Sequence, residues 1–251
     1  VVTERLIDDR NLDTVKEALK NTAGVSCQAA EGGEEDIKLR GFSLAATGDI
    51  FVDGMRDPAF YERDTFSLDR MEVLRGSASM LFGRGSTGGA VNLVTKAPRL
   101  IDEHQLDVTL GSHNERRVVG DFNIKTGESA ALRINAMSTA ADNNGAGSSL
   151  DKKGVSATYR WGIGERDEFS VGAYHLDNNN GMNYGMPWIR PTAAQSASNP
   201  GGSPTSATTT LPLDPSAYYG MASDYNAGTA TYGTLSHLHR FDADSELKTQ
   251  I

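Results

Sequence analysis

The side chains that could do chemistry in this sequence are few and scattered. Its five histidines do not have the spacing of a metal site; they are His104, His113, His175, His237 and His239. His237 and His239 share one face of an expected strand, but the sequence offers them no third ligand. We therefore interpret the histidines as structural or loop residues and predict no metal site.

The single cysteine, Cys27, has no partner for an internal disulfide and no companion for a metal. It is interpreted as a buried or half-buried structural residue. No nucleophile with a nearby base and no phosphate-binding loop can be recognised in the sequence. We predict that the protein is not an enzyme and carries no resident cofactor.

The most distinctive stretch runs from Arg56 to Lys96. Its charges lie between short apolar runs, and its glycines gather between Gly76 and Gly89. Glycine permits backbone conformations that other residues avoid, so this pattern indicates tight turns. The stretch predicts a backbone shaped by turns, with charges placed between short strands.

Composition favours a β-rich protein and argues against some partners. The formal net charge of −9 makes nucleic acid an unsuitable partner. Only 38% of the residues are hydrophobic and 27 are glycine, which is typical of turn-rich β-proteins and of barrels with a wet interior. No apolar run approaches the roughly 18 residues of a membrane helix, although membrane-spanning strands leave a much weaker signal.

Residues 1–98 are expected to form a small mixed α+β domain. A helix is predicted over residues 13–20, capped by Asn11 or Asp13 and followed by Gly24. Asp53-Gly54 predicts a hairpin turn. Short strands are expected at residues 25–29, 37–39, 50–52, 71–74 and 91–95.

Residues 99–251 have a different pattern, in which apolar and polar residues alternate. Strands are expected at residues 105–111, 116–125, 131–139, 155–161, 168–176 and 229–241, with a seventh from Ser245. Short and long connections alternate, except that residues 111–115 form a short loop on the long side. Trp161 and Phe169 flank a short turn, as in the aromatic girdle of an outer-membrane barrel.

Arg and Asp within the polar faces suit a water-filled lumen, but a soluble antiparallel sandwich also has alternating strands. Seven strands cannot close around a domain of this size, and barrels that hold a plug have about 22 strands. The chain is therefore expected to be a piece of a longer protein.

Four segments resemble the plug of TonB-dependent outer-membrane siderophore receptors. They read LDTVKEALKNTAGV (12–25), LRGF with IFVDG (39–54), MEVLRG (71–76) and SMLFGRGSTGGAVNLVTK (79–96). Ser77 and Thr87 stand where the family usually has proline. RDPAFY (56–61) and YGMPW (184–188) resemble the catecholate-type branch more closely.

The resemblance implies an α+β plug domain over residues 1–98, followed over residues 99–251 by the first strands of an antiparallel transmembrane β-barrel, 22-stranded when complete. It implies import of ferric siderophores across the bacterial outer membrane, with iron arriving as part of the substrate. The implied partners are a ferric siderophore, outer-membrane lipid and TonB, whose recruiting box is expected before Val1. Alternatives are a hydroxamate, ferrichrome-like or haem carrier as cargo, or a soluble β-rich binding or adhesion module.

The resemblance also implies roles for individual residues. Apical loops at residues 44–49, 55–62 and 80–85 would form the floor of the ligand pocket, and residues 177–228 part of its wall. The implied ligand contacts are Arg56, Asp57, Phe60, Tyr61, Phe82 and Arg84 in the plug, and Tyr184, Met186 and Trp188 in the barrel loop. Phe60 or Tyr61 could instead pack inside the plug. Arg40, Glu72 and Arg75 are implied to dock the plug onto barrel carboxylates.

Overall fold

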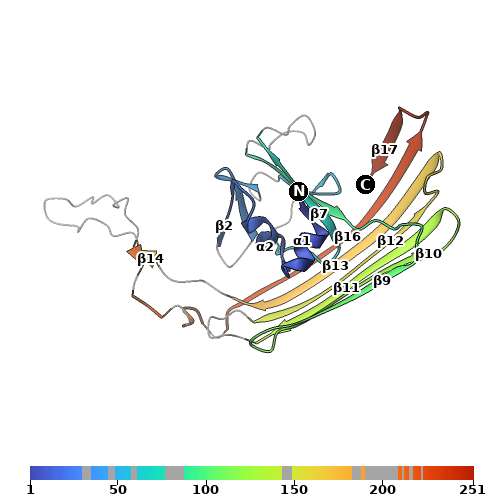
Figure 1. Cartoon of the computed structure of the whole chain (residues 1–251). Helices are drawn as coiled ribbons and strands as arrows, with labels where there is room; N and C mark the ends of the chain where they lie inside the picture. The colour runs from blue at the N-terminus through green and yellow to red at the C-terminus, as the bar shows by residue number, and fades with distance from the viewer. Residues whose placement is uncertain are drawn as a thin grey trace.

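A small mixed domain lies against one face of a long, curved antiparallel sheet (Figure 1). The computed structural model describes residues 1–29, 35–44, 49–57, 61–76, 88–142, 149–182, 188–189, 209–210, 212–214, 217–221 and 223–251. We call the first part the N-terminal domain and the second the long sheet. The N-terminal domain has an apolar core, whereas the long sheet buries charged and polar side chains.

The N-terminal domain contains a five-stranded sheet in the order β1-β7-β8-β5-β6 and a three-stranded sheet in the order β2-β3-β4. Neighbouring strands are antiparallel except for β5 and β8, which are parallel. The bounds are β1 (Val2–Thr3), β2 (Val25–Ala29), β3 (Glu35–Leu39), β4 (Phe42–Ser43), β5 (Ile50–Val52), β6 (Met55–Arg56), β7 (Leu68–Arg75) and β8 (Gly89–Thr95). Each strand predicted in this region is present, and Asp53-Gly54 forms the predicted turn with positive φ at both residues.

The short helices α1 (Glu4–Asp9) and α2 (Val15–Lys20) accompany these strands. The cap of α2 is Thr14, not Asn11 or Asp13 as predicted, because Thr14 and Glu17 satisfy each other's backbone N–H groups in a capping box. The α1 helix was not predicted, since it buries only Ile7 and has no periodic apolar face. None of the described helices is long and apolar enough to cross a membrane.

The core of the N-terminal domain is apolar and continuous. It combines one face of each helix with the inner faces of both sheets. Its buried members are Val2, Ile7, Val15, Ala18, Leu19, Ile37, Leu39, Leu44, Ile50, Leu68, Met71, Val91 and Leu93. This cluster holds the domain together as a conventional globular core does.

The long sheet has seven strands in the order β17-β16-β13-β12-β11-β10-β9, with every neighbouring pair antiparallel. The bounds are β9 (Glu103–Leu110), β10 (Arg116–Lys125), β11 (Ala130–Ala141), β12 (Leu150–Trp161), β13 (Asp167–Gly181), β16 (Tyr225–Arg240) and β17 (Glu246–Gln250). All seven predicted strands are present, and β10 matches its predicted bounds.

The long sheet turns its polar face toward the N-terminal domain. On β10, Arg117 and Asp121 are buried, whereas Val118 and Phe122 are exposed on the opposite face. A soluble sandwich would need a second layer over the apolar face, but the N-terminal domain covers the polar face instead (Figure 1). The sandwich interpretation is therefore wrong.

Connections between the strands alternate as predicted, including the one exception, the short connection of residues 111–115 at the end of the long loops. At one end of the sheet they cover only residues 126–129, 162–166 and 241–245. At the other end the longest covers residues 182–224 and contains the small hairpin of β14 (Trp188–Ile189) and β15 (Thr209–Thr210). The predicted domain boundary between residues 98 and 99 falls between β8 and β9, and it stays a prediction.

Candidate functional site

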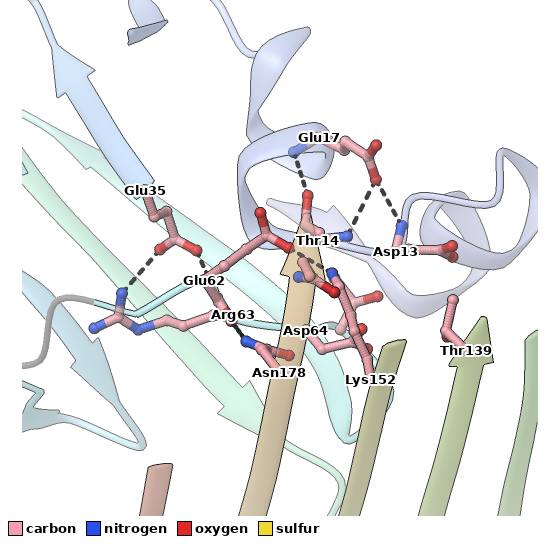
Figure 2. Close-up of polar contacts among 12 residues, drawn as sticks. Asp13, Thr14, Glu17, Glu35, Glu62, Arg63, Asp64, Thr139, Lys152 and Asn178 are labelled. Atoms are coloured by element: carbon pink, nitrogen blue, oxygen red, sulfur yellow. Dashed lines mark hydrogen bonds and ion pairs between the residues drawn. The ribbon is translucent and has the colours of Figure 1, made fainter. Parts of the chain in front are cut away.

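A short segment of the N-terminal domain, residues 61–66, carries contacts to three strands of the long sheet: β10, β12 and β13. Figure 2 shows its contacts with Lys152 of β12 and Asn178 of β13. We call it the docking segment. It follows β6 and leads into β7, so the strands on either side hold its ends. Its contacts combine ion pairs, a hydrogen bond to the backbone of Glu62 and aromatic packing.

Arg117 on β10 binds two acidic residues of the N-terminal domain. Its Nη2 lies 2.7 Å from Asp64 Oδ1 and its Nη1 lies 3.0 Å from Asp64 Oδ2, which makes the pair bidentate. The Nε atom lies 3.1 Å from Asp13 Oδ1, and Nη1 also donates to Thr139 Oγ1. Because the side chains of Arg117 and Asp64 are 5% and 0% exposed, loss of either would leave a buried, unpaired charge.

Glu62 is held by two neighbouring strands at once. Lys152 on β12 donates from Nζ to Glu62 Oε1, and the Lys152 side chain is almost fully buried. On β13, Asn178 donates from Nδ2 to the backbone oxygen of Glu62 at 3.0 Å (Figure 2). The long sheet thus fixes both the side chain and the backbone of this residue.

Phe66 provides the apolar part of the contact. It is buried, and its ring stacks on that of Tyr174 with centroids 5.7 Å apart. Gly154 on β12 lets the ring approach, because a Cβ atom there would lie 2.7 Å from Phe66 Cε1. The segment is therefore fitted to the sheet by shape as well as by charge.

A second ionic contact lies where the chain leaves the N-terminal domain. Lys96 Nζ is 2.7 Å from Glu4 Oε1 and 3.0 Å from Asp121 Oδ2 on β10. Burial opposes its charge, but the hydrogen bonds with Glu4 and Asp121 raise the pKa of Lys96. Arg133 on β11 binds the same Asp121 at 2.7 Å and donates to the backbone oxygen of Ala97. This network ties α1 and the connection to the long sheet.

Arg63 points away from the sheet and anchors the docking segment to the N-terminal domain. Its Nη1 lies 2.8 Å from Glu35 Oε1, and its backbone N–H donates to Glu35 Oε2. Its Nε donates to Asp57 Oδ2 at 3.0 Å. Burial raises the pKa of Glu35 to about 7, and the positive charge of Arg63 opposes that rise. Burial disfavours the charge of Arg63 too, but Glu35 and Asp57 together raise its pKa, so the guanidinium stays protonated.

Asp13 is the acidic residue of the Arg117 network whose protonation changes near neutral pH. Burial raises the pKa of Asp13 to about 6, although the charge of Arg117 acts in the opposite direction. Asp13 is therefore mostly charged at neutral pH and takes up a proton under mildly acidic conditions. Protonation removes one of the two negative partners of Arg117.

Of the predicted ligand contacts whose side chains the structure describes, Arg56 is the most open. Its side chain is 35% exposed, lies 3.7 Å from Asp49 Oδ1 and sits over the ring of Phe51. Arg56 and Asp57 line a groove of about 200 Å³ together with Tyr232 of β16. The groove places a cation and a carboxylate beside an aromatic side chain.

Asp57 and Tyr61 are also engaged within the N-terminal domain. The Tyr61 hydroxyl donates to Asp57 Oδ2 at 3.0 Å, and the guanidinium carbon of Arg63 lies 4.5 Å from the centre of the Tyr61 ring. Both residues keep part of their surface exposed. Their role as ligand contacts stays a prediction. The other predicted contacts Phe60, Phe82, Arg84, Tyr184 and Met186 lie outside the described residues, and Trp188 is placed only by its backbone in β14.

The three predicted locking residues lie on the N-terminal domain. Glu72 accepts hydrogen bonds from Asn92 Nδ2 and Arg70 Nε, and the bond from Asn92 in particular lowers the pKa of Glu72. Arg40 and Arg75 are exposed. Within the described part of the chain, no ion pair joins any of the three to the long sheet, so their docking role also stays a prediction.

Sequence reasoning missed the residues that make the contact with the sheet. They are Glu62, Asp64 and Phe66 on one side and Arg117 and Lys152 on the other. Long charged side chains at inward positions of alternating strands were visible, and so was the charged run in residues 62–64. Which charges pair across the interface depends on how the domain sits in the sheet, and strand periodicity does not contain that information.

A globular domain held by ion pairs on the polar face of a sheet, whose other face is apolar, is the arrangement of a plugged outer-membrane barrel. Comparisons with known proteins agree. Residues 1–90 match the model of the TonB-dependent receptor plug domain. The chain therefore belongs to the TonB-dependent receptors, with the N-terminal domain as the plug and the long sheet as part of the barrel.

Individual relatives are receptors of the same kind. The probable TonB-dependent receptor BfrD of Bordetella pertussis is 34% identical over 75% of this chain and 26% of its own length. The catecholate siderophore receptor Fiu of Escherichia coli K12 is 28% identical over the whole chain and 33% of its length. The ferrioxamine B receptor of Salmonella typhimurium is 28% identical over 75% of this chain and 28% of its own length.

A solved structure of the ferric-catecholate import receptor Fiu from E. coli K12 superposes with a TM-score of 0.83 at 26% identity. The match covers 99% of this chain and 37% of that protein. The chain thus spans about a quarter to a third of the length of the curated relatives it matches.

Proposed function

We propose that the complete receptor imports a ferric siderophore across the bacterial outer membrane, with energy delivered through TonB. The observation that carries this proposal is the docking of a plug by buried ion pairs onto the polar face of a barrel sheet. The siderophore class rests on the relatives, among which the catecholate receptor Fiu is similar over the whole chain. A ferric catecholate is therefore the proposed cargo.

The plug interface fits a gate that closes firmly and opens on demand. A buried ion pair is costly to desolvate and only marginally stabilising, so it holds position without making release prohibitive. Arg117 and Lys152 bind the docking segment from the sheet, while Arg63 anchors it to the plug. A pull on the plug would break these contacts one after another and would clear a path along the polar face.

Ligand capture is proposed for the plug apices and the long barrel loop. Ferric siderophores are bulky, often anionic and edged with aromatic or carbonyl groups. Arg56 supplies a partly exposed cation, and Tyr232 adds an aromatic side chain to the same groove. The remaining proposed contacts are Asp57, Phe60, Tyr61, Phe82, Arg84, Tyr184, Met186 and Trp188. Iron is carried by the siderophore, so no protein side chain needs to ligate it and no catalytic step is proposed.

The proposal is tested with the full-length receptor in a bacterium that lacks its own catecholate receptors. Uptake of radioactive iron from a ferric catecholate should appear with the receptor and disappear when TonB is removed. Arg56→Ala should weaken uptake more than Arg5→Ala, which alters a fully exposed arginine of α1. Uptake that persists without TonB, or that never exceeds the level of the empty vector, contradicts the proposal.

The likeness to the ferrioxamine B receptor favours a second candidate cargo, a hydroxamate siderophore. The same uptake assay with ferrioxamine B decides between the two. Uptake of ferrioxamine B with no uptake of the ferric catecholate would replace the catecholate assignment and leave the import function in place.

A further inference from the structure

The outer face of the barrel sheet contains a cluster that the sequence did not reveal. His237 and His239 on β16 lie beside Asp167, the first residue of β13. One ligand atom from each of the three side chains lies within 4.8 Å of the others. Strand pairing thus supplies the third ligand that the two histidines lack in the sequence.

The two imidazoles converge on a single oxygen. His237 Nε2 lies 2.9 Å from Asp167 Oδ1, and His239 Nδ1 lies 2.6 Å from the same atom. A zinc ion with bonds of 2.0–2.2 Å needs its ligand atoms about 3.3 Å apart in a tetrahedral arrangement. Small side-chain rotations would therefore admit an ion at the point where the three atoms now meet.

The rings are already oriented by aromatic neighbours. Phe169 stacks on His237 with centroids 4.4 Å apart and planes only 6° from parallel. Phe241 meets His239 edge-on at 4.6 Å. Neighbours that fix the orientation of ligating side chains are a regular part of metal sites.

The cluster lies at the end of the sheet and carries an unneutralised charge. The side chains of Asp167, His237 and His239 are 45%, 40% and 23% exposed, and they lie beside the short connections 162–166 and 241–245, where water can supply a fourth ligand. Within the described residues, no lysine or arginine forms an ion pair with Asp167. Two neutral imidazoles with one carboxylate give a site of net negative charge, which attracts a cation.

We propose that Asp167, His237 and His239 bind a divalent transition-metal cation such as Zn²⁺. Imidazole nitrogen favours such metals, whereas Mg²⁺ and Ca²⁺ prefer oxygen ligands. The ion would cross-link β13 and β16, the strands that flank the longest connection of the barrel sheet, at the end where the connections are short. This role is separate from cargo transport and does not depend on the proposed siderophore.

The test measures Zn²⁺ binding to the full-length receptor in detergent micelles, without a histidine tag, by competition with a chromogenic chelator. The wild type should bind one Zn²⁺ that excess Mg²⁺ does not displace. Asp167→Asn, His237→Gln and His239→Gln should each weaken binding at least tenfold, since even an outer-shell substitution typically costs about 10–100-fold.

His175→Gln is the matched control, because His175 is an exposed histidine on the outer face of β13 that bonds Thr231 instead. It should bind Zn²⁺ as the wild type does. The shift between heated and unheated samples on a gel confirms that each variant is a folded barrel. Three results would overturn the proposal: site variants that bind Zn²⁺ as tightly as the wild type, a His175→Gln variant that loses as much affinity as the site variants, or a wild type without saturable Zn²⁺ binding.

Discussion

The plug and the barrel sheet bury opposite kinds of side chain. The plug buries an apolar cluster that includes Leu19 and Met71, and it keeps most charges at its surface. The sheet buries Arg117, Asp121 and Lys152 and exposes apolar side chains on its other face. A whole sheet face of apolar side chains is favourable where lipid replaces water, so the two patterns reflect two solvents.

This difference explains why the interface is built from charge. An apolar plug surface would find few partners on the inner face of the sheet, because that face is mainly polar outside the cluster of Met137, Tyr174 and Leu176. The plug therefore presents Asp13, Glu62 and Asp64 to the cations of the sheet, and Phe66 fills the space that Gly154 leaves open. Attachment depends on a few named pairs, and each can be broken separately.

The largest effect is expected from Arg117→Ala. Removing this side chain leaves Asp64 buried without its cation and deprives Asp13 of its partner. Breaking a buried pair from one side typically costs about 3–5 kcal/mol. Hydrogen exchange, followed by mass spectrometry on the full-length receptor, should show that the free energy of opening residues 61–76 falls by this amount.

Arg116→Ala is the control for this variant, because Arg116 is the exposed neighbour on the same strand. It should leave the exchange of residues 61–76 unchanged. Combining Arg117→Ala with Asp64→Asn should cost less than the sum of the single changes, since the two residues share one interaction. Simple additivity would show that the pair does not couple plug and barrel.

Phe66→Ala is expected to have the next largest effect. The change removes a buried ring that stacks on Tyr174, and substitutions of this kind typically cost about 3–5 kcal/mol in a closed core. At an interface that can partly collapse, we expect about 2–3 kcal/mol in the same exchange measurement. Gly154→Ala should also loosen the plug, because its methyl group would meet the ring of Phe66. Unchanged hydrogen exchange of residues 61–76 in both variants would show that shape contributes little to docking.

Asp13→Asn gives a smaller effect that depends on pH. The pKa of Asp13 is about 6 in the folded plug and 3.8 as the ordinary value, so the folded state binds the proton more tightly between these limits. The contribution of protonated Asp13 to the stability of the folded plug is fully present below pH 3.8, and it is lost as the pH rises through 6. Asparagine avoids the cost of burying a charge, so the variant should be roughly 2 kcal/mol more stable than the wild type at pH 7.5 and equal to it near pH 4. This is somewhat less than the roughly 3 kcal/mol of a two-unit pKa shift, because the Asp13 side chain is partly exposed.

Exchange rates of residues 61–76, measured across this pH range and corrected for intrinsic exchange, test the Asp13 prediction. Asp9→Asn is the control, since Asp9 is an exposed residue of the neighbouring helix. A difference between Asp13→Asn and the wild type that stays constant with pH would show that Asp13 does not titrate within the interface.

Much of the fold could be predicted because the signals are local. Alternation predicted all seven strands of the long sheet, the sixth less cleanly and the seventh only by its start, and it predicted β10 to the residue. The hairpin at Asp53-Gly54 followed from its turn residues. The helix α1 could not be predicted, because its six residues bury only Ile7 and leave no periodic pattern to recognise.

The interface could not be predicted in the same way. Asp64 and Arg117 are far apart in the sequence, and either could pair with several other charges. The third ligand of the histidine cluster, Asp167, was hidden for the same reason, since only the register of β13 against β16 places it opposite His239. Local patterns give the face on which a side chain lies, and the packing of whole elements selects its partner.

Arg75→Ala should have the smallest effect on the docking segment and therefore sharpens the contrast with Arg117. Arg75 is exposed, and no ion pair joins it to the long sheet within the described residues, so the free energy of opening residues 61–76 should change by less than about 0.5 kcal/mol.

The proposed locking role concerns barrel carboxylates beyond those residues, and exclusion of large antibiotics by cells with the full-length receptor measures it. Arg75→Ala should make these cells more sensitive than Arg70→Ala does, but less than Arg117→Ala does. Normal exclusion together with normal transport in Arg75→Ala would refute the lock and would leave Arg117 and Lys152 as the residues that hold the plug.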